Sequence, residues 1–362
     1  MRIVQYHPRA GSGDGGITNS VRRLSEAFAR CGASSVILAD ADSDAPTLEG
    51  VEWRMIRHRR AGRLMWPTGL TEAIRDADLV VLNSAWTLQN VLTGRAAHHL
   101  GIPYVLAPRG AYDPLILRRR RLFKRIWWRL AEGRLVRDAL AVHAFFESQG
   151  PDLARLGYTG PVLVAPNGVA VPVGTWPPAS EPYLLYLGRF DPEHKGLDLL
   201  VRAVSAAPEG RLPVLRMHGP DRANGKARVL KLIHDLGAES RVVVGGAVYG
   251  DAKWQLMAGA SGFVYPSRWE GFGNAPAEAC ALGVATVATP YPLGRFLAEH
   301  DAAILAEPTV DALLAALLRL QTAEAGAIGE RAAALVRATF SWDAVAESWL
   351  AQAERLLGRR SA

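Results

Sequence analysis

The stretch that most constrains the fold is an apolar run, a glycine loop and a run of helix-forming residues at 262–282. The run at 262–265 is typical of a buried strand, and 277–282 is typical of a helix. Such a loop directs backbone N–H groups and the positive end of the helix dipole toward one point, which suits a phosphate. Glu270 precedes the two loop glycines, and we expect Glu278 in the first turn of the helix, where it accepts hydrogen bonds from ligand hydroxyls. The alternative is an ordinary turn with two solvated glutamates.

The same alternation of buried runs and helical periodicity extends over most of the chain and predicts an α/β protein with parallel sheets. The expected strands are 2–6, 34–39, 79–83, 102–107, 141–145, 162–165, 183–187, 214–218, 241–245, 262–265 and 284–288. The expected helices include 17–30, 197–207, 227–236, 251–260, 310–320, 328–339 and 342–357.

Size and composition indicate two domains of a globular protein. A chain of 362 residues is long for one core, and 49% hydrophobic residues against 21% charged residues argue against disorder. Its two cysteines, Cys31 and Cys280, show no metal-ligand spacing, which fits a reducing compartment. No apolar run is long enough for a signal peptide or a spanning helix, so we expect a cytoplasmic protein. The net charge of +7 permits a nucleic acid, an anionic membrane or a phosphorylated ligand as partner.

A second glycine loop follows the first strand. Gly11, Gly13 and Gly16 match G-x-G-x-x-G, and Asp40 follows the second strand, as in a dinucleotide-binding fingerprint. In that fingerprint the strand runs directly into the first glycine, whereas residues 7–10 intervene here. A nicotinamide-dependent oxidoreductase that uses the Gly11 to Gly16 loop is therefore an alternative with weak support.

The stretch at 266–281 resembles the nucleotide-sugar signature of retaining GT-B glycosyltransferases, in particular glycosyltransferase family 4. The matching residues are Pro266, Ser267, Glu270, Gly271, Phe272, Gly273, Glu278 and Ala279. The resemblance implies that Glu278 binds the nucleotide ribose and Glu270 the donor sugar. It also implies that the loop amides contact the sugar and phosphates, which assigns Gly271, Phe272, Gly273, Asn274 and Ala275 to the donor site. Pro276 has no N–H, so one such contact is missing.

Three further glycine positions and two cations also match the family. Residues 188–196 resemble its G-R-x(n)-K-G motif, which implies that Arg189 and Lys195 bind the donor diphosphate. Fixed cations stabilise the charge that the leaving group gains in the transition state. The resemblance places Gly15 and Gly16 near the donor phosphates, and Gly246 where the base is held by backbone. The alternatives are a solvated basic loop at 188–196 and a flexible turn at 15–16.

The acceptor side is predicted from strand ends in the first half of the chain. Ligands of open α/β sheets lie at the carboxyl ends of strands, so Asn83 and Ser84 are candidates, as are Arg109 and Tyr112. Many family members have a histidine where this chain has Arg109, so no histidine role is transferred. Arg109 offers a charge-assisted contact to a phosphate or an acidic acceptor, or it is a surface arginine that caps a strand.

The segment Arg118 to Arg137 is dense in cations and has apolar residues at near-helical spacing. It is predicted as a helix whose apolar face packs on its own domain, holds the enzyme on anionic lipid, or grips an acidic or pyrophosphate-linked acceptor. No RNA- or DNA-binding motif accompanies its charges, so we expect no nucleic-acid partner.

The resemblance implies a GT-B fold: two Rossmann-like domains facing a central cleft, with a C-terminal helix that crosses back to the first domain. The expected bounds are 1–172 for the acceptor domain, 173–182 for a linker, 183–341 for the donor domain and 342–362 for the helix. The expected reaction transfers a hexose from a nucleoside-diphosphate sugar to a carbohydrate or lipid-linked acceptor, with retention, in bacterial polysaccharide or glycolipid assembly. Glu270, Arg189, Lys195 and Arg109 are the expected catalytic residues, which position and stabilise rather than attack.

No cofactor and no essential metal are expected. Metal-dependent transferases of the other common fold use Asp-x-Asp, and this chain has that pattern at 40–42, 42–44 and 76–78, away from the donor motif. A non-catalytic nucleotide-sugar binder, possible if Arg109 marks a lost site, is the second alternative. The donor sugar, its base and the acceptor are not predicted.

Overall fold

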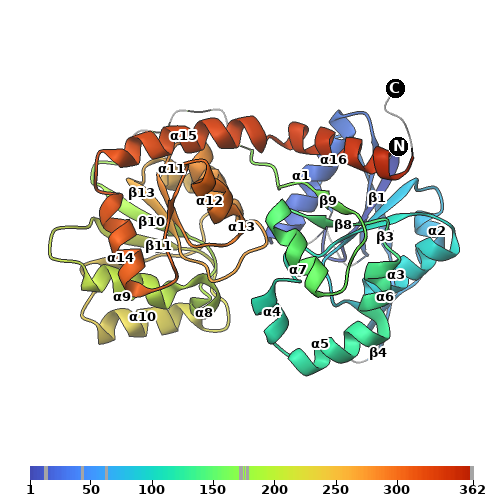
Figure 1. Cartoon of the computed structure of the whole chain (residues 1–362), viewed down its shortest axis with the longest axis horizontal. Helices are drawn as coiled ribbons and strands as arrows, with labels where there is room; N and C mark the ends of the chain where they lie inside the picture. The colour runs from blue at the N-terminus through green and yellow to red at the C-terminus, as the bar shows by residue number, and fades with distance from the viewer. Residues whose placement is uncertain are drawn as a thin grey trace. The chain divides into compact units, whose positions relative to one another are not determined.

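The protein divides into two compact units (Figure 1), here described from a computed structural model. The structure describes residues 1–11, 15–41, 45–61, 64–170, 174, 176 and 179–358. Unit 1 comprises Met1–Gly168 and Phe340–Ala362, and unit 2 comprises Val169–Thr339. Gly13 of the first glycine loop, Asp42, Asp44 and part of the expected linker lie outside the described residues.

Unit 1 is built on a seven-stranded parallel sheet with the order β3-β2-β1-β6-β7-β8-β9. Most of its strands are continuous apolar runs because helices cover both faces. The strands are β1 Arg2–Tyr6, β2 Ser34–Asp40, β3 Val51–Ile56, β6 Leu79–Asn83, β7 Tyr104–Ala107, β8 Ala141–Ala144 and β9 Val162–Val164. A separate antiparallel hairpin consists of β4 His58–Ala61 and β5 Leu64–Pro67.

Alternate residues of these strands point into two different cores. Ile3 packs with α1 (Gly16–Arg30) and α16 (Trp342–Leu356), whereas Val4 packs with α2 (Leu70–Ile74), α3 (Leu88–His99) and α6 (Gly133–Arg137). Figure 1 shows the C-terminal helix α16, in red, beside α1, in blue, and the buried ring of Trp349 lies 4.9 Å from that of Phe28. The helices of unit 1 are α1 Gly16–Arg30, α2 Leu70–Ile74, α3 Leu88–His99, α4 Pro114–Arg118, α5 Arg121–Trp127, α6 Gly133–Arg137, α7 Gly150–Arg155 and α16 Trp342–Leu356, with the short η1 Trp128–Glu132 and η2 Glu147–Gln149.

The edge strand β9 is closed by a side chain of α16. The Gln352 amide accepts a hydrogen bond from the Val164 N–H at 3.1 Å and donates one to the Val164 carbonyl at 2.8 Å. It therefore satisfies backbone groups that an edge strand otherwise leaves unpaired.

The cationic segment at 118–137 differs from the single helix predicted. Helix α4 ends at Arg118, Arg119 is extended and Arg120 is left-handed with φ of 52°, before α5 begins. The next residues form the π-helical turn η1, which leads into α6 at Gly133. A Cβ at Gly133 would lie 2.7 Å from the Trp128 carbonyl oxygen, so this wider turn depends on glycine.

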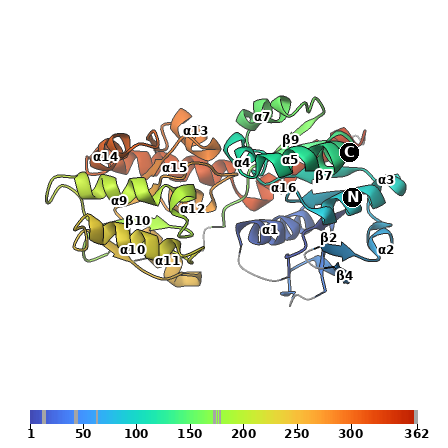
Figure 2. The same cartoon turned by 90° about the horizontal axis from the view of Figure 1, so that it is seen from below.

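Unit 2 contains a six-stranded parallel sheet with the order β12-β11-β10-β13-β14-β15. Its strands are β10 Tyr183–Leu187, β11 Val214–His218, β12 Val242–Val244, β13 Gly262–Tyr265, β14 Thr286–Ala288 and β15 Ile304–Leu305. Its helices are α8 Pro192–Lys195, α9 Leu197–Ala206, α10 Gly225–Asp235, α11 Gly250–Ala258, α12 Asn274–Ala281, α13 Pro292–Glu299, α14 Val310–Arg319 and α15 Glu324–Thr339. Figures 1 and 2 both show α9 and α10 side by side, and α12 packs with α15.

Candidate active site

The strand order of unit 2 reverses between β10 and β13, where open α/β sheets bind ligands. The loops at 188–196 and 266–273 leave the carboxyl ends of these two strands and run against each other. The Arg268 N–H donates to the His194 carbonyl at 2.9 Å. Gly196 has a φ of 65°, and a Cβ there would lie 2.1 Å from the Pro266 carbonyl oxygen. Only glycine allows the loops to approach so closely.

Lys195 and Glu270 form a buried ion pair between these loops. The Lys195 ammonium donates to Glu270 Oε1 and to the Tyr265 hydroxyl, the latter at 2.7 Å, and only 4% of Lys195 is exposed. Burial alone would raise the pKa of Glu270, but the charge and hydrogen bond of Lys195, together with the Ser267 hydroxyl, lower it below its usual value. Glu270 is therefore an ionised carboxylate at neutral pH.

His194 lies beside this pair without a charge of its own. Its ring stacks on Trp269 with centroids 4.4 Å apart, and its Nε2 lies 2.9 Å from the Trp269 carbonyl oxygen. A carbonyl only accepts, so Nε2 carries the proton. Burial, followed by the charge of Lys195, lowers the pKa of His194 to about 4, so the ring is neutral at pH 7.

Arg189 differs from Lys195 in having no acidic partner. Its side chain is exposed and forms no ion pair within the part of the chain that the structure describes. Because Glu270 balances the charge of Lys195, Arg189 is the uncompensated cation of the loop at 188–196. It is therefore available to an anionic ligand.

Helix α12 begins three residues earlier than predicted, at Asn274. Gly273 caps it in a left-handed conformation with φ of 100°, and the chain turns helical immediately afterwards. Glu278 consequently lies in the second turn, and its expected place in the first turn is wrong. Its Oε1 accepts from Lys253 of α11 at 2.7 Å, while burial, which outweighs Lys253, raises its pKa.

The remaining predicted donor residues lie on loops and helix starts. Phe272 is buried between partly exposed Gly271 and the cap residue Gly273, and Asn274 and Ala275 open α12 ahead of Pro276. Gly246 is exposed just after β12, and its carbonyl accepts from the Gly219 N–H at 3.0 Å. In unit 1, Gly15 caps α1 and Gly16 is its first residue, both exposed.

Arg109 of unit 1 is held by neutral oxygens. Its guanidinium donates two hydrogen bonds to Asn83 Oδ1, at 3.0 and 2.8 Å, and a longer one to Asn167 Oδ1 at 3.5 Å. Burial lowers the pKa of Arg109 to about 10, so it stays charged at pH 7, and no carboxylate among the described residues pairs with it. Asn83 is fully buried, so it positions Arg109.

Three residues just after the carboxyl ends of β6 and β7 have strained backbone conformations. Ser84, Trp86 and Arg109 all have positive φ, at 79°, 63° and 54°. Such conformations are costly for residues other than glycine and cluster at functional sites. The predicted residues Asn83, Ser84 and Arg109 share this strained edge.

Tyr112 is buried, and its hydroxyl is already used within unit 1. It donates to Glu132 Oε1 at 2.7 Å, and the same carboxylate accepts from the Trp86 N–H at 3.1 Å and the Trp127 indole at 3.0 Å. Sequence reasoning missed Glu132, although it is the one acidic residue between 114 and 137. It also missed Lys253, which lies 25 positions from its partner and has no local signal.

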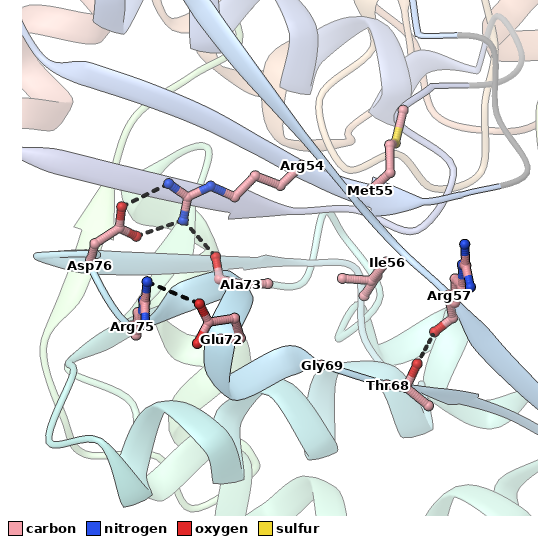
Figure 3. A pocket seen from close by; sticks show the side chains of 10 residues that line it. All are labelled: Arg54, Met55, Ile56, Arg57, Thr68, Gly69, Glu72, Ala73, Arg75 and Asp76. Carbon is pink, nitrogen blue, oxygen red and sulfur yellow. Dashed lines mark hydrogen bonds and ion pairs between the residues drawn. The ribbon is translucent and has the colours of Figure 1, made fainter.

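A surface pocket of unit 1 contains none of the predicted residues (Figure 3). It lies at β3 and α2, and its charges pair with one another: Arg54 binds Asp76 at 2.6 and 2.7 Å, and Arg75 lies 3.0 Å from Glu72. Asp78, two residues after Asp76, accepts from the Arg2 N–H. The Asp-x-Asp pattern at 76–78 is thus bound by protein donors.

Comparison with known proteins identifies both halves of the chain. Residues 15–168 match the family model described as glycosyl transferase 4-like domain, and residues 181–323 match that described as glycosyl transferases group 1. GDP-mannose:cellobiosyl-diphosphopolyprenol alpha-mannosyltransferase of Xanthomonas campestris is 26% identical over 309 residues, which cover 81% of this chain and 79% of that protein.

Solved structures show the same fold over nearly the whole chain. The Anabaena protein HepE in complex with UDP-glucose has a TM-score of 0.80 at 18% identity, and covers 98% of this chain and 100% of its own. Sucrose-phosphate synthase from Thermosynechococcus elongatus has a TM-score of 0.77 at 22% identity, with 99% of both chains covered. With both family models matched in consecutive halves of the sequence, the chain belongs to the glycosyl transferases of group 1, the family 4 glycosyltransferases of the GT-B fold.

Proposed function

We propose that this glycosyltransferase transfers a hexose, mannose in the first instance, from a GDP-sugar to a lipid-diphosphate-linked saccharide with retention of anomeric configuration. The observation that carries the proposal is the charge layout where the order of unit 2 strands reverses. There an ionised Glu270 is fixed by Lys195, and Arg189 remains uncompensated. A nucleoside-diphosphate sugar needs both an acceptor for sugar hydroxyls and a cation for phosphate.

Each part of the donor has a matching group in unit 2. Arg189 and the N–H groups at the start of α12 suit the diphosphate, Glu270 the sugar and Glu278 the ribose. The departing nucleoside diphosphate gains negative charge, and one well-placed contact to it contributes about 3 kcal/mol to catalysis. In this proposal cations of the protein do that work, and no metal is essential.

Retention without a covalent intermediate is supported by the restraint on Glu270. Its Oε1 is bound by the Lys195 ammonium and lies 2.7 Å from the Ser267 hydroxyl. A carboxylate whose charge is shared with a neighbouring ammonium is a weaker nucleophile toward the anomeric carbon, but it still accepts hydrogen bonds from sugar hydroxyls. The departing phosphate then takes the acceptor proton on the same face of the sugar.

The acceptor is proposed from Arg109 and from the relatives. Arg109 is a charged group with only neutral partners, which suits an anionic acceptor such as a diphosphate. The Xanthomonas relatives are named for a diphosphopolyprenol-linked acceptor. A lipid-linked acceptor places the enzyme at a membrane surface, as a peripheral protein.

A thermal-shift panel of GDP, UDP, ADP, NAD and their sugar forms, with magnesium or with EDTA, tests the donor. A ligand at 100 times its Kd adds about 2.7 kcal/mol to stability. We expect GDP and GDP-mannose to raise Tm in EDTA, and Glu278→Ala to abolish the shift while the exposed Glu209→Ala retains it. If only UDP and its sugars raise Tm, the donor base is uracil and not guanine. If only NAD raises Tm, the oxidoreductase alternative is favoured. NMR of the product then shows whether the anomer is retained.

A further inference from the structure

The most exposed apolar surface of the described chain lies on the cationic segment of unit 1. Four of the five most exposed large apolar residues in the described ranges lie here. They are Leu122, Phe123, Ile126 and Leu130, which are 73%, 52%, 51% and 72% exposed. We call these four residues the apolar ridge. Their spacing places them along one side of α5 and η1.

The opposite side of the same segment is anchored in unit 1. The Trp127 indole donates a hydrogen bond to the buried Glu132. The ring centroid of Trp128 lies 6.1 Å from that of Trp86 and 6.0 Å from that of Tyr112. Lys124 lies 5.5 Å from the centroid of the Trp86 ring and donates to the Ile116 carbonyl. The apolar ridge is therefore exposed on a segment whose other side packs against unit 1.

The sequence around the ridge is rich in cations. Residues 114–131 contain seven cations and no Asp or Glu. Among the described residues, Arg121, Arg125 and Arg129 have no acidic partner, and all three are exposed. A protein partner of ordinary composition would have to match this run with acids. An anionic bilayer supplies negative charge at its surface and an apolar layer directly below.

We infer that the apolar ridge and its flanking arginines dock unit 1 on an anionic phospholipid bilayer, with the ridge inserted among the acyl chains and the guanidinium groups at the phosphates. Among the described residues, no helix combines the length and the hydropathy of a membrane span. The inference deepens the proposed function, because it identifies the surface that brings the enzyme to a lipid-linked acceptor. All residues of this surface belong to unit 1.

Vesicle flotation of the full chain tests the inference directly. The probes are vesicles of phosphatidylcholine alone and with about 30 mol % phosphatidylglycerol, at about 0.1 and 0.5 M NaCl. We expect the wild type to float with the anionic vesicles at low salt, to float less at high salt, and to stay largely unbound with phosphatidylcholine. No flotation with anionic vesicles would overturn the inference.

Two triple variants separate the apolar and the charged contributions. Leu122→Ser, Ile126→Ser and Leu130→Ser together should lower vesicle partitioning at least about tenfold, because several buried methylene groups are lost. Arg121→Gln, Arg125→Gln and Arg129→Gln should lower it by about fivefold per cation. The matched controls alter exposed residues elsewhere and should bind as the wild type does. The apolar control is Leu230→Ser in α10 with Leu236→Ser directly after it, and the charge control is Arg95→Gln with Arg155→Gln and Arg211→Gln.

Two further measurements keep the outcomes distinct. Sedimentation of the wild type and the serine variant shows whether the ridge instead joins two copies of the chain, in which case the wild type dimerises and the variant does not. The nucleotide thermal shift of the serine variant should equal that of the wild type. Failure of the wild type to bind anionic vesicles, with its nucleotide shifts intact, would refute this inference alone, whereas vesicle binding by the wild type without any nucleotide shift would refute the proposed function alone.

Discussion

Two glutamates, Glu132 fully buried in unit 1 and Glu270 largely buried in unit 2, have pKa values shifted in opposite directions. Glu270 of unit 2 is compensated by the Lys195 ammonium, whereas Glu132 of unit 1 is fully buried and accepts from three neutral donors, a phenol, an indole and a backbone N–H. Burial pushes both pKa values upward, and it prevails at Glu132, while the cation reverses the shift at Glu270. Burial therefore sets the direction of the pKa shift only where no cation lies beside the carboxylate, and a neighbouring ammonium reverses it.

The largest effect is expected when the cation is removed from the Glu270 pair. Lys195→Ala leaves a buried carboxylate without its partner, which costs about 3–5 kcal/mol. It also removes the group that fixes Glu270, and we expect kcat/KM to fall about 100- to 1000-fold. Urea unfolding and transferase assays measure both.

Lys231→Ala is the matched control for Lys195→Ala. Lys231 is 74% exposed and pairs with Asp235 on the surface of the same unit, so its loss should cost less than about 1 kcal/mol. Near-normal activity of Lys195→Ala would show that Glu270 needs no cation to work.

The same isosteric change in both glutamates sharpens the comparison. Glu270→Gln leaves Lys195 buried and uncompensated, at a cost of about 3 kcal/mol. In Glu132→Gln the amide oxygen still accepts from the Trp86 N–H and the Tyr112 hydroxyl, and only the Trp127 indole loses its acceptor. We expect a cost of about 1 kcal/mol in stability. Urea unfolding of both variants measures the difference, and an equal or reversed order would mean that Glu132 depends on its charge.

The pH dependence of stability should differ in sign between the two sites. The pKa of Glu270 is below its unfolded value near 4.5, so its contribution is present above that value and is lost as pH falls toward the folded pKa. The pKa of Glu132 is above 4.5, so the folded state holds a proton that the unfolded state releases, and stability falls as pH rises through that interval.

Urea unfolding as a function of pH separates these contributions. Relative to the wild type, Glu270→Gln should flatten the loss of stability on the acid side of 4.5, and Glu132→Gln should flatten the loss on the alkaline side. Flattening on the same side by both variants would contradict the opposite shifts.

The smallest effect is expected from a neutral neighbour of Glu270. Ser267→Ala removes a hydroxyl 2.7 Å from Glu270 but leaves the ion pair, so it should cost about 1 kcal/mol and weaken donor binding less than about tenfold. Thermal unfolding with and without donor measures both. Ser205→Ala in α9, whose hydroxyl bonds only the Val201 carbonyl, is the control for donor binding.

Buried strands were predictable because their signal is local. The runs 2–6, 79–83, 183–187 and 262–265 match β1, β6, β10 and β13 to the residue, since helices on both faces favour continuous apolar sequence. The run 214–218 also matches β11, although only Leu215 and Met217 of that strand are buried. Edge strand β3 was missed because its residues are half-exposed and give no continuous apolar run.

The surroundings of the site residues were not predictable in the same way. The donors to Glu132 include Tyr112, 20 positions away, and Trp86, 46 positions away. They are positioned by strand ends and by the positive φ of Trp86. The cationic segment carried a helical period, but the break at Arg119 and the π-helical turn determine which apolar residues face outward. Such details depend on tertiary packing, which a single sequence does not state.

The pairing of Gln352 with Val164 sets an order of events during synthesis of the chain. Unit 1 needs α16 to close its edge strand and to cover the face that contains Phe28, and α16 is translated after the whole of unit 2. A ribosome must therefore complete all of unit 2 before unit 1 receives its final layer. Until then the nascent first unit exposes the apolar face that α16 later covers, and exposed apolar surface of this kind promotes aggregation during folding.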